Sequence, residues 1–215
     1  MLERKARQEI CQVMRELKSR GLNRGAEGNI SMRFGEGFLI TPSGVLPEDM
    51  TPEQIVLLDM EGNWDGAWKP SSEWRMHRDI YQNRPQAGAV IHTHSTHATA
   101  LSCLQRPIPP FHYMIALAGG EIIDCAPYAT FGTEELSRNM LKGLGERKAT
   151  LLANHGMICF EETLGRAMVL AETVEELARQ FILASSVGEP QRLSAAEMAR
   201  VLEKFSAYGQ SLKKL

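Results

Sequence analysis

Apolar residues recur every three or four positions over several stretches of the chain, and this spacing predicts amphipathic helices. The first stretch covers residues 2–21, where Gly21 and the following polar residues end the apolar repeat. Further helices are expected over residues 72–82, 97–104, 134–144, 163–186 and 195–207. Helices therefore begin the chain, end it and alternate with other elements between.

Shorter apolar runs bounded by glycine or polar residues predict β-strands. The expected strands cover residues 29–33, 37–41, 54–60, 87–94, 121–126 and 149–152. Gly35 and Gly37 separate the first two strands as in a hairpin. The last strand resumes at residues 157–160, so the intervening Asn154-His155-Gly156 is expected to form a bulge within it.

The order of these elements indicates an α/β fold of α+β-like character. Strands mixed with helices form layered domains, but most connections here are too short or not helical enough for a doubly wound parallel sheet. We expect residues 1–215 to form a single three-layer domain, with a largely antiparallel central sheet flanked by helices on both sides. The sequence shows no repeats, low-complexity tracts or linkers rich in proline, glycine or serine.

Composition narrows the functional class. The 215 residues are 43% hydrophobic and 23% charged, which is typical of a soluble globular protein. Lys plus Arg is 24 and Asp plus Glu is 26, a net charge of −2, whereas proteins that bind nucleic acid are usually basic. No apolar run approaches the roughly 20 residues of a membrane-spanning helix. We expect neither a nucleic-acid nor a membrane partner.

The four cysteines indicate a cytoplasmic location. Cys11, Cys103, Cys125 and Cys159 are widely and irregularly spaced, form no C-x-x-C pair, and follow a charged start without a signal-peptide core. We expect reduced thiols, most simply explained by core packing or chance surface placement.

His92 and His94 form the sharpest local signal for chemistry. Side chains at i and i+2 of a strand share a face, roughly 6.5 Å apart along the chain, so both imidazoles can reach one metal ion. The alternative is two partly buried histidines bonded to backbone carbonyls, since H-x-H alone is a weak motif. His155 strengthens the metal interpretation, because a third imidazole completes a catalytic zinc site with one open position. The other histidines, His77 and His97 among them, fit a surface or structural role better, although His97 could support the site from outside.

Glu73 is the candidate acid or base. A carboxylate in the first turn of the helix over 72–82 normally only stabilises the helix dipole. Here Pro70-Ser71-Ser72 precedes it, and free N–H groups and hydroxyls at a helix start can bind an anion. The turns at Gly28-Asn29 and Ser43-Gly44 could share this role, although such turns usually only reverse the chain. Together they suggest a phosphate site without lysine; P-loop, dinucleotide-binding and Gly-x-Ser-x-Gly motifs are absent.

These motifs resemble the class II aldolase/adducin family over nearly the whole chain. The matching segments, in order, are residues 28–31, 39–44, 70–77, 90–95, 112–116, 125–133, 154–156 and 202–209. The Ser-Ser-Glu, His-Thr-His and His-Gly set is specific to the family. The 125–133 block and the tail narrow the resemblance toward its ketose-1-phosphate aldolases, such as those acting on L-fuculose 1-phosphate.

The resemblance implies a set of site residues. It implies a metal, zinc or alternatively cobalt or manganese, on His92, His94 and His155, with Glu73 as a fourth ligand when no substrate is bound. It implies phosphate binding by Gly28, Asn29, Ser43, Gly44, Ser71 and Ser72. Tyr113, Phe131, Phe205 and Tyr208 match positions at the aldehyde end of the substrate. In the family these come partly from a neighbouring subunit of a cyclic homotetramer, with the active site at the interface.

The implied reaction is reversible cleavage of a ketose 1-phosphate to dihydroxyacetone phosphate and an aldehyde. Glu73 would exchange the proton at C3, and Tyr113 would handle the proton of the C4 hydroxyl. The substrate would be L-fuculose 1-phosphate or a related 5-deoxy or 5-methylthio ketopentose 1-phosphate. Residues 188–194 lack the family's usual proline-rich run before the last helix. Because the tail closes over the aldehyde end of the substrate, the sequence does not identify which aldehyde is released.

Three alternatives remain on the same scaffold. A 5-methylthioribulose-1-phosphate dehydratase shares three histidines and a carboxylate. A pentulose-phosphate 4-epimerase typically carries Asp at the position of Glu73, which counts against it. A non-enzymatic module like the adducin head would have lost the metal ligands, all of which this chain keeps.

Overall fold

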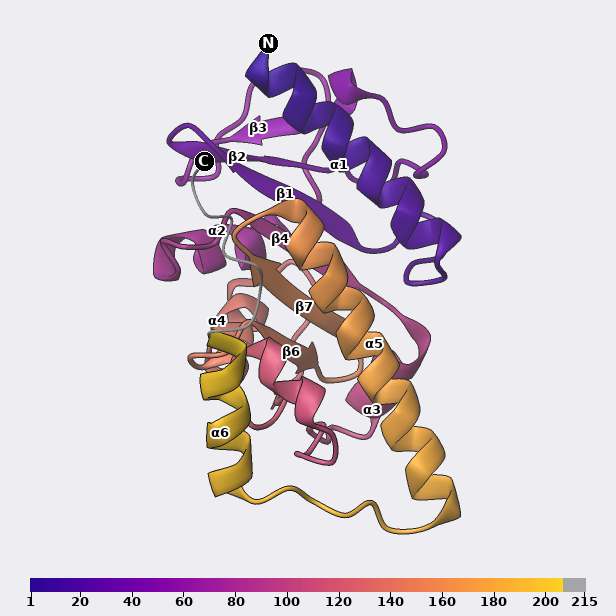
Figure 1. The fold of residues 1–215 in the computed structure, drawn as a ribbon. Helices are drawn as coiled ribbons and strands as arrows, with labels where there is room; N and C mark the ends of the chain where they lie inside the picture. Colours follow the sequence, from indigo (N-terminus) through magenta and orange to yellow (C-terminus); the bar gives the residue numbers. More distant parts are fainter. Residues whose placement is uncertain (207–215) are drawn as a thin grey trace, which may run out of the picture.

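The computed structural model describes residues 1–206 and places every strand of that range in one sheet (Figure 1). The strands are β1 (Asn29–Phe34), β2 (Gly37–Ile40), β3 (Val56–Leu58), β4 (Ala89–Thr93), β5 (Cys125–Ala126), β6 (Ala149–Leu152) and β7 (Gly156–Glu161). Their order across the sheet is β3-β2-β1-β4-β7-β6-β5. All neighbours are antiparallel except β5 and β6, which confirms the largely antiparallel sheet.

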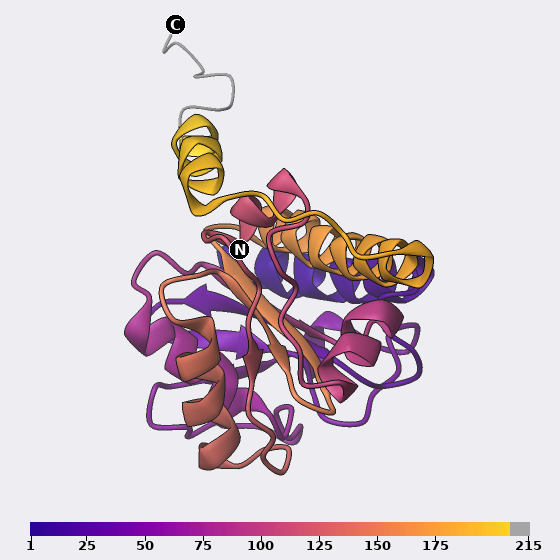
Figure 2. The same cartoon turned by 90° about the horizontal axis from the view of Figure 1, so that it is seen from below.

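Helices cover both faces of the sheet, as the amphipathic patterns predict. Helices α1 (Leu2–Ser19), α3 (Thr96–Cys103) and α5 (Leu164–Val187) lie on one face, and α2 (Trp74–Asn83) and α4 (Glu134–Leu144) lie on the other (Figure 2). The apolar side chains form two clusters, one on each face of the sheet. Because strand residues alternate between the faces, Ile91 packs into the first cluster and Val90 into the second. The three-layer arrangement is therefore confirmed.

The last described helix, α6 (Ala195–Ser206), stands away from the sheet. It packs against η2, a 3-10 helix over Tyr113–Ala118, and projects beyond the body of the molecule (Figure 2). A second short 3-10 helix, η1 (Pro52–Gln54), precedes β3 and shortens the strand expected over residues 54–60. Within residues 1–206, no helix combines the length and the apolar character that crossing a bilayer requires.

One expectation about the strands is wrong. Residues 149–160 do not form a single strand with a bulge, because the chain reverses at residues 153–155 and β6 and β7 pair as an antiparallel hairpin. Asn154 occupies the left-handed region at φ 55°, which asparagine tolerates better than most residues and which turns the chain. Gly156 then lies so close to the Thr93 carbonyl that a Cβ atom would come within 2.3 Å of its oxygen.

The boundaries of one helix and one strand also differ from the prediction. Helix α2 begins at Trp74, so Glu73 is the residue capping the helix and not a member of its first turn. The strand expected over residues 121–126 is regular only at Cys125–Ala126, although Ile123 also forms an isolated bridge with Ile108.

Candidate metal centre and anion-binding loops

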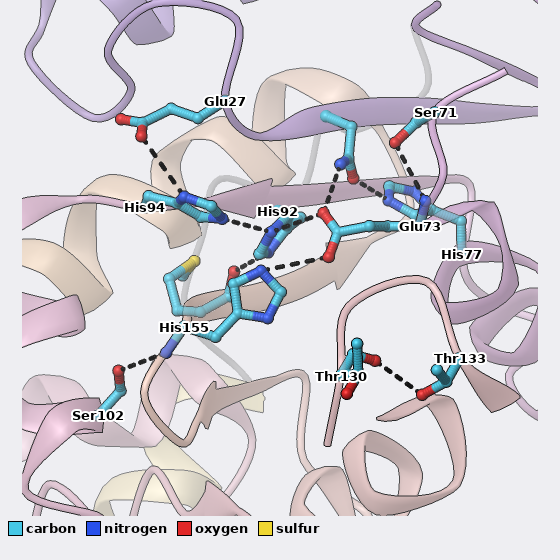
Figure 3. A network of polar contacts seen from close by, with 12 residues as sticks. Glu27, Ser71, Glu73, His77, His92, His94, Ser102, Thr130, Thr133 and His155 are labelled. Atoms are coloured by element: carbon cyan, nitrogen blue, oxygen red, sulfur yellow. Dashed lines mark hydrogen bonds and ion pairs between the residues drawn. The ribbon is translucent and has the colours of Figure 1, made fainter. Parts of the chain in front are cut away.

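Two antiparallel strands and a helix start bring the predicted metal ligands together. His92 lies in β4 and His94 directly follows that strand, while His155 is the last residue of the turn before β7, the neighbour of β4. Glu73 arrives from the start of α2 on the opposite side (Figure 3). One ligand atom from each of the four residues lies within 4.8 Å of all the others.

The four side chains point toward a common centre. The Nε2 atoms of His92 and His94 are 3.0 Å apart. Glu73 places Oε2 at 3.1 Å from Nε2 of His92 and Oε1 at 3.2 Å from Nε2 of His155. A tetrahedral zinc ion with bonds of about 2.05 Å holds its ligand atoms about 3.3 Å apart. Three imidazole nitrogens and a carboxylate at this spacing fit a divalent metal ion.

The Nδ1 atoms of His92 and His94, which face away from the common centre, also have partners. Nδ1 of His92 donates to the carbonyl of Met157 over 2.8 Å, so in the neutral ring the Nε2 lone pair faces the centre. Nδ1 of His94 faces Oε2 of Glu27 at 3.5 Å. Such partners fix the orientation of metal-binding imidazoles. Sequence inspection missed Glu27, because an acidic residue in a glycine-rich turn carries no signal of its contact.

Electrostatics favours a charged Glu73. Burial raises the pKa of its carboxyl, but the charges and hydrogen bonds of His92 and His155 outweigh burial and hold that pKa well below its usual range. Burial lowers the pKa of His92, but Glu73 outweighs it and raises that pKa overall. Burial, followed by the neighbouring histidines, lowers the pKa of His94 to about 3. His94 is thus neutral near pH 7, as a metal ligand must be.

A pocket of about 300 Å³ opens beside the four ligands. Its lining includes all six residues expected to bind phosphate: Gly28, Asn29, Ser43, Gly44, Ser71 and Ser72. Neither lysine nor arginine lines it among the described residues. Within residues 1–206, the backbone N–H groups of Gly28, Gly44 and Ser72 donate no hydrogen bond. Unpartnered backbone N–H donors of this kind form anion-binding concavities.

Gly28 shows why the sequence folds this way. Its φ of 71° is in the left-handed region, and a Cβ atom there would come within 2.3 Å of the Asn23 side chain. The same Asn23 accepts a hydrogen bond from the His94 backbone N–H through Oδ1. The close approach at Gly28 thus joins the loop before β1 to the segment that carries His94.

The residues expected at the aldehyde end of the substrate lie in two separate places in the structure. Phe131 is 65% exposed and lies on the rim of the pocket beside the metal ligands. Tyr113 and Phe205 stack on each other with centroids 6.3 Å apart and line a separate groove between η2 and α6. A single chain therefore does not bring Tyr113 to the four ligands. Tyr208 lies outside the described residues.

The remaining histidines have structural partners. His97 donates its backbone N–H to Glu175 in α5 and places Nδ1 2.7 Å from the same carboxylate, so it joins α3 to α5. His77 is fully buried and lies 2.5 Å from Asn29 through Nε2. The surface alternative considered for His77 is therefore wrong.

Comparisons with known proteins identify the family of the chain. The family model described as "Class II Aldolase and Adducin N-terminal domain" matches residues 8–182. The chain is 53% identical to a 5-methylthioribulose-1-phosphate/5-deoxyribulose-1-phosphate aldolase of Rhodospirillum rubrum, over 94% of this chain and 91% of the relative. It is 48% identical to an L-fuculose phosphate aldolase of Escherichia coli K12, over 97% and 98% of the two chains. A solved L-fuculose 1-phosphate aldolase superposes with a TM-score of 0.91 at 40% identity, over 94% of this chain and 96% of the other.

Proposed function

The chain belongs to the class II aldolase and adducin family, and from this premise we propose that it is a metal-dependent aldolase. It would reversibly cleave a ketose 1-phosphate to dihydroxyacetone phosphate and an aldehyde. The observation that carries the proposal is the meeting of three imidazoles and one carboxylate at the edge of a pocket lined by unpartnered backbone N–H groups.

His92, His94 and His155 would hold the metal ion, with Glu73 as a fourth ligand until a substrate displaces it. Zinc suits three imidazole nitrogens and a carboxylate, and cobalt or manganese are alternatives. When bound, the ion supplies Lewis acidity that stabilises the negative charge developing as the C3–C4 bond breaks. The close spacing of the four ligand atoms supports this assignment.

The turns around the pocket would hold the substrate phosphate. Gly28, Gly44 and Ser72 offer backbone N–H groups, and the amide of Asn29 and the hydroxyls of Ser43, Ser71 and Ser72 offer side-chain groups. Such a site binds the phosphate through dipoles, without a neighbouring lysine or arginine.

Glu73 would move the proton at C3. Glu73 is 7% exposed; its Oε2 accepts a hydrogen bond from Asn29, and its Oε1 lies 3.2 Å from Nε2 of His155. A base of this kind must lie within hydrogen-bond reach of the carbon-bound proton.

Tyr113 would exchange the proton of the C4 hydroxyl, with Phe131, Phe205 and Tyr208 near the aldehyde.

Tyr113 would reach the metal centre of a neighbouring subunit. Its groove and the metal-site pocket share no lining residue, and Tyr113 is 51% exposed. This separation supports active sites at subunit interfaces, and we propose that the assembly is a homotetramer. We also propose that residues 1–215 form one domain and that the enzyme is cytoplasmic, in keeping with its four unpaired cysteines.

The substrate would be L-fuculose 1-phosphate or a 5-deoxy or 5-methylthio ketopentose 1-phosphate. The names of the relatives support both choices. The exposed ring of Phe131 on the pocket rim can contact a methyl or thioether group.

An aldol-cleavage assay tests the function. L-fuculose, L-rhamnulose, L- and D-ribulose, 5-deoxyribulose and 5-methylthioribulose 1-phosphates would be offered, with release of dihydroxyacetone phosphate coupled to NADH oxidation. Chelator-sensitive release from at least one sugar is expected. No release from any of them, with metal still bound, would instead favour the dehydratase or the epimerase.

A further inference from the structure

A chain of buried hydrogen bonds leads from the sheet to Glu73. His77 lies one helical turn after Glu73 in α2 and is fully buried. Its Nε2 is 2.5 Å from Oδ1 of Asn29, and its Nδ1 is 2.7 Å from the hydroxyl of Ser31. The Ser31 hydroxyl is 2.8 Å from the Tyr81 hydroxyl. At the other end, Nδ2 of Asn29 donates to Oε2 of Glu73 over 3.0 Å.

The directions of these bonds follow from which atoms can donate, starting from the amide nitrogen of Asn29, which donates to Glu73. A carboxylate only accepts hydrogen bonds, so Asn29 must present its amide nitrogen to Glu73 and its oxygen to His77. His77 must then donate from Nε2. Burial, and next the charge of His92, lowers the pKa of His77 to about 3, so the ring is neutral near pH 7 and Nδ1 accepts from Ser31.

The orientation of the Asn29 amide matters for two anions, the Glu73 carboxylate and the substrate phosphate. The Asn29 amide nitrogen carries two hydrogens, of which one is used by Glu73. Asn29 also lines the pocket proposed to hold the substrate phosphate. If the amide turned over, its oxygen would face the Glu73 carboxylate, and the site would lose a charge-assisted hydrogen bond.

A small change in the orientation of Asn29 would also affect a proposed metal ligand. In the β1–β4 ladder its Cα pairs with that of His92, a proposed metal ligand. Asn29 thus contacts Glu73 through its side chain and is paired with His92 through its backbone.

We propose that His77 is a positioning residue: by donating from Nε2 to Asn29 it holds the Asn29 amide in the one orientation that serves both Glu73 and an incoming phosphate. The inference rests on the proposed function, since it assigns His77 a task in that same site. His77 itself touches neither the four ligands' common centre nor the pocket.

Two substitutions at position 77 separate positioning from packing. His77→Leu fills the space but donates no hydrogen bond, whereas His77→Gln retains an N–H donor. We expect His77→Leu to weaken zinc affinity of the purified protein by about 10- to 100-fold, the range seen when a partner behind a metal ligand is lost. It should also raise KM for the phosphorylated substrate. His77→Gln should restore most of both losses.

A double-mutant cycle tests the route through Asn29. In an Asn29→Ala background, His77→Leu should change zinc affinity much less than it does alone, because the partner that transmits the effect is gone. The control is His97→Gln, which alters a histidine bonded to Glu175 and should leave zinc affinity unchanged. Zinc affinity would be measured by competition with a colorimetric chelator, and folding by circular dichroism.

Equal zinc affinity in folded His77→Leu and wild-type protein would overturn the proposal, as would equal losses in the leucine and glutamine variants. If His77→Leu does not fold, nitrogen-15 NMR of the wild-type histidines decides. We expect His77 in the Nε2–H form, with Nδ1 accepting, and the opposite form would refute the assignment. That spectrum needs no metal, so failure of wild-type protein to bind zinc would reject the proposed function separately.

Discussion

Oε2 of Glu27 lies 3.5 Å from Nδ1 of His94, on the side of the ring that faces away from the other ligands. The Glu27 carboxylate also accepts a hydrogen bond from the Arg24 backbone N–H through Oε1, which holds it in the turn before β1. A carboxylate behind a metal-binding histidine orients the ring and increases its basicity. Glu27 would thus support the proposed metal centre through His94.

Glu27→Gln should lower zinc affinity by about 10-fold, the lower end of the effect of such partners, because the pair is partly exposed to water. Chelator competition would measure it, with Glu36→Gln in the exposed β1–β2 turn as a matched control. Unchanged zinc affinity in Glu27→Gln would show that the contact does not support His94.

Glu73→Gln should retain the fold but lose cleavage activity. The substitution keeps the size of the side chain and removes the group proposed to move the proton at C3, a loss of about 10²- to 10⁴-fold in kcat. The coupled assay would measure kcat, and elemental analysis would measure bound metal. Near wild-type kcat with metal bound would exclude the proton-transfer role.

Removing the metal should abolish cleavage reversibly. Dialysis against a chelator should leave a folded but inactive protein, and added zinc, cobalt or manganese should restore activity to different extents. His155→Ala provides the matched variant, since it removes one imidazole from the four ligands. Activity that survives complete metal removal would contradict the proposed mechanism.

Mixed oligomers can show whether Tyr113 acts on a neighbouring subunit. Tyr113→Phe and Glu73→Gln should each be nearly inactive alone. If they are co-expressed in equal amounts, roughly a quarter of the interface sites would combine an intact Glu73 with an intact Tyr113. Recovery of about that fraction of wild-type activity is expected. No recovery in mixed oligomers of confirmed composition would place both groups in one chain.

Stability of the metal-free protein should fall as pH falls below about 6.5. Burial lowers the pKa of His77 to about 3, so between these values the unfolded chain binds a proton that the folded chain does not. The free energy of unfolding then decreases by up to about 1.4 kcal/mol per pH unit from this group alone. Urea unfolding of wild type and His77→Gln should give a shallower pH dependence for the variant. Parallel curves would show that folding does not lower the pKa of His77.

Much of the candidate metal centre is predictable from local sequence. His92 and His94 are two positions apart at the end of an apolar run, and the spacing predicts that they share a face, although β4 itself ends at Thr93. Glu73 is recognisable through the Ser71-Ser72-Glu73 pattern, although its position before the helix is not. The reversal at Asn154 escaped prediction because an interrupted apolar run fits either a bulge or a hairpin.

Other features depend on contacts between distant segments. Asn29 and Glu73 are 44 positions apart, and neither residue's neighbours in sequence indicate that they bond. The same holds for Glu27 and His94, which meet only because the loop before β1 approaches the end of β4. The separation of Tyr113 from the ligands depends on how η2 and α6 pack, which no periodicity records.

The three histidines gather at the adjoining ends of β4 and β7, where Thr93 of β4 pairs with Met157 of β7 beside His94 and His155. β4 and β7 are each paired on both sides, and strands inside a sheet open with free energies that approach that of global unfolding. A bound ion would stabilise the whole sheet, because its affinity for the folded chain adds directly to the free energy of unfolding. Metal supply would therefore govern how long the protein survives proteolysis, as well as whether it is active.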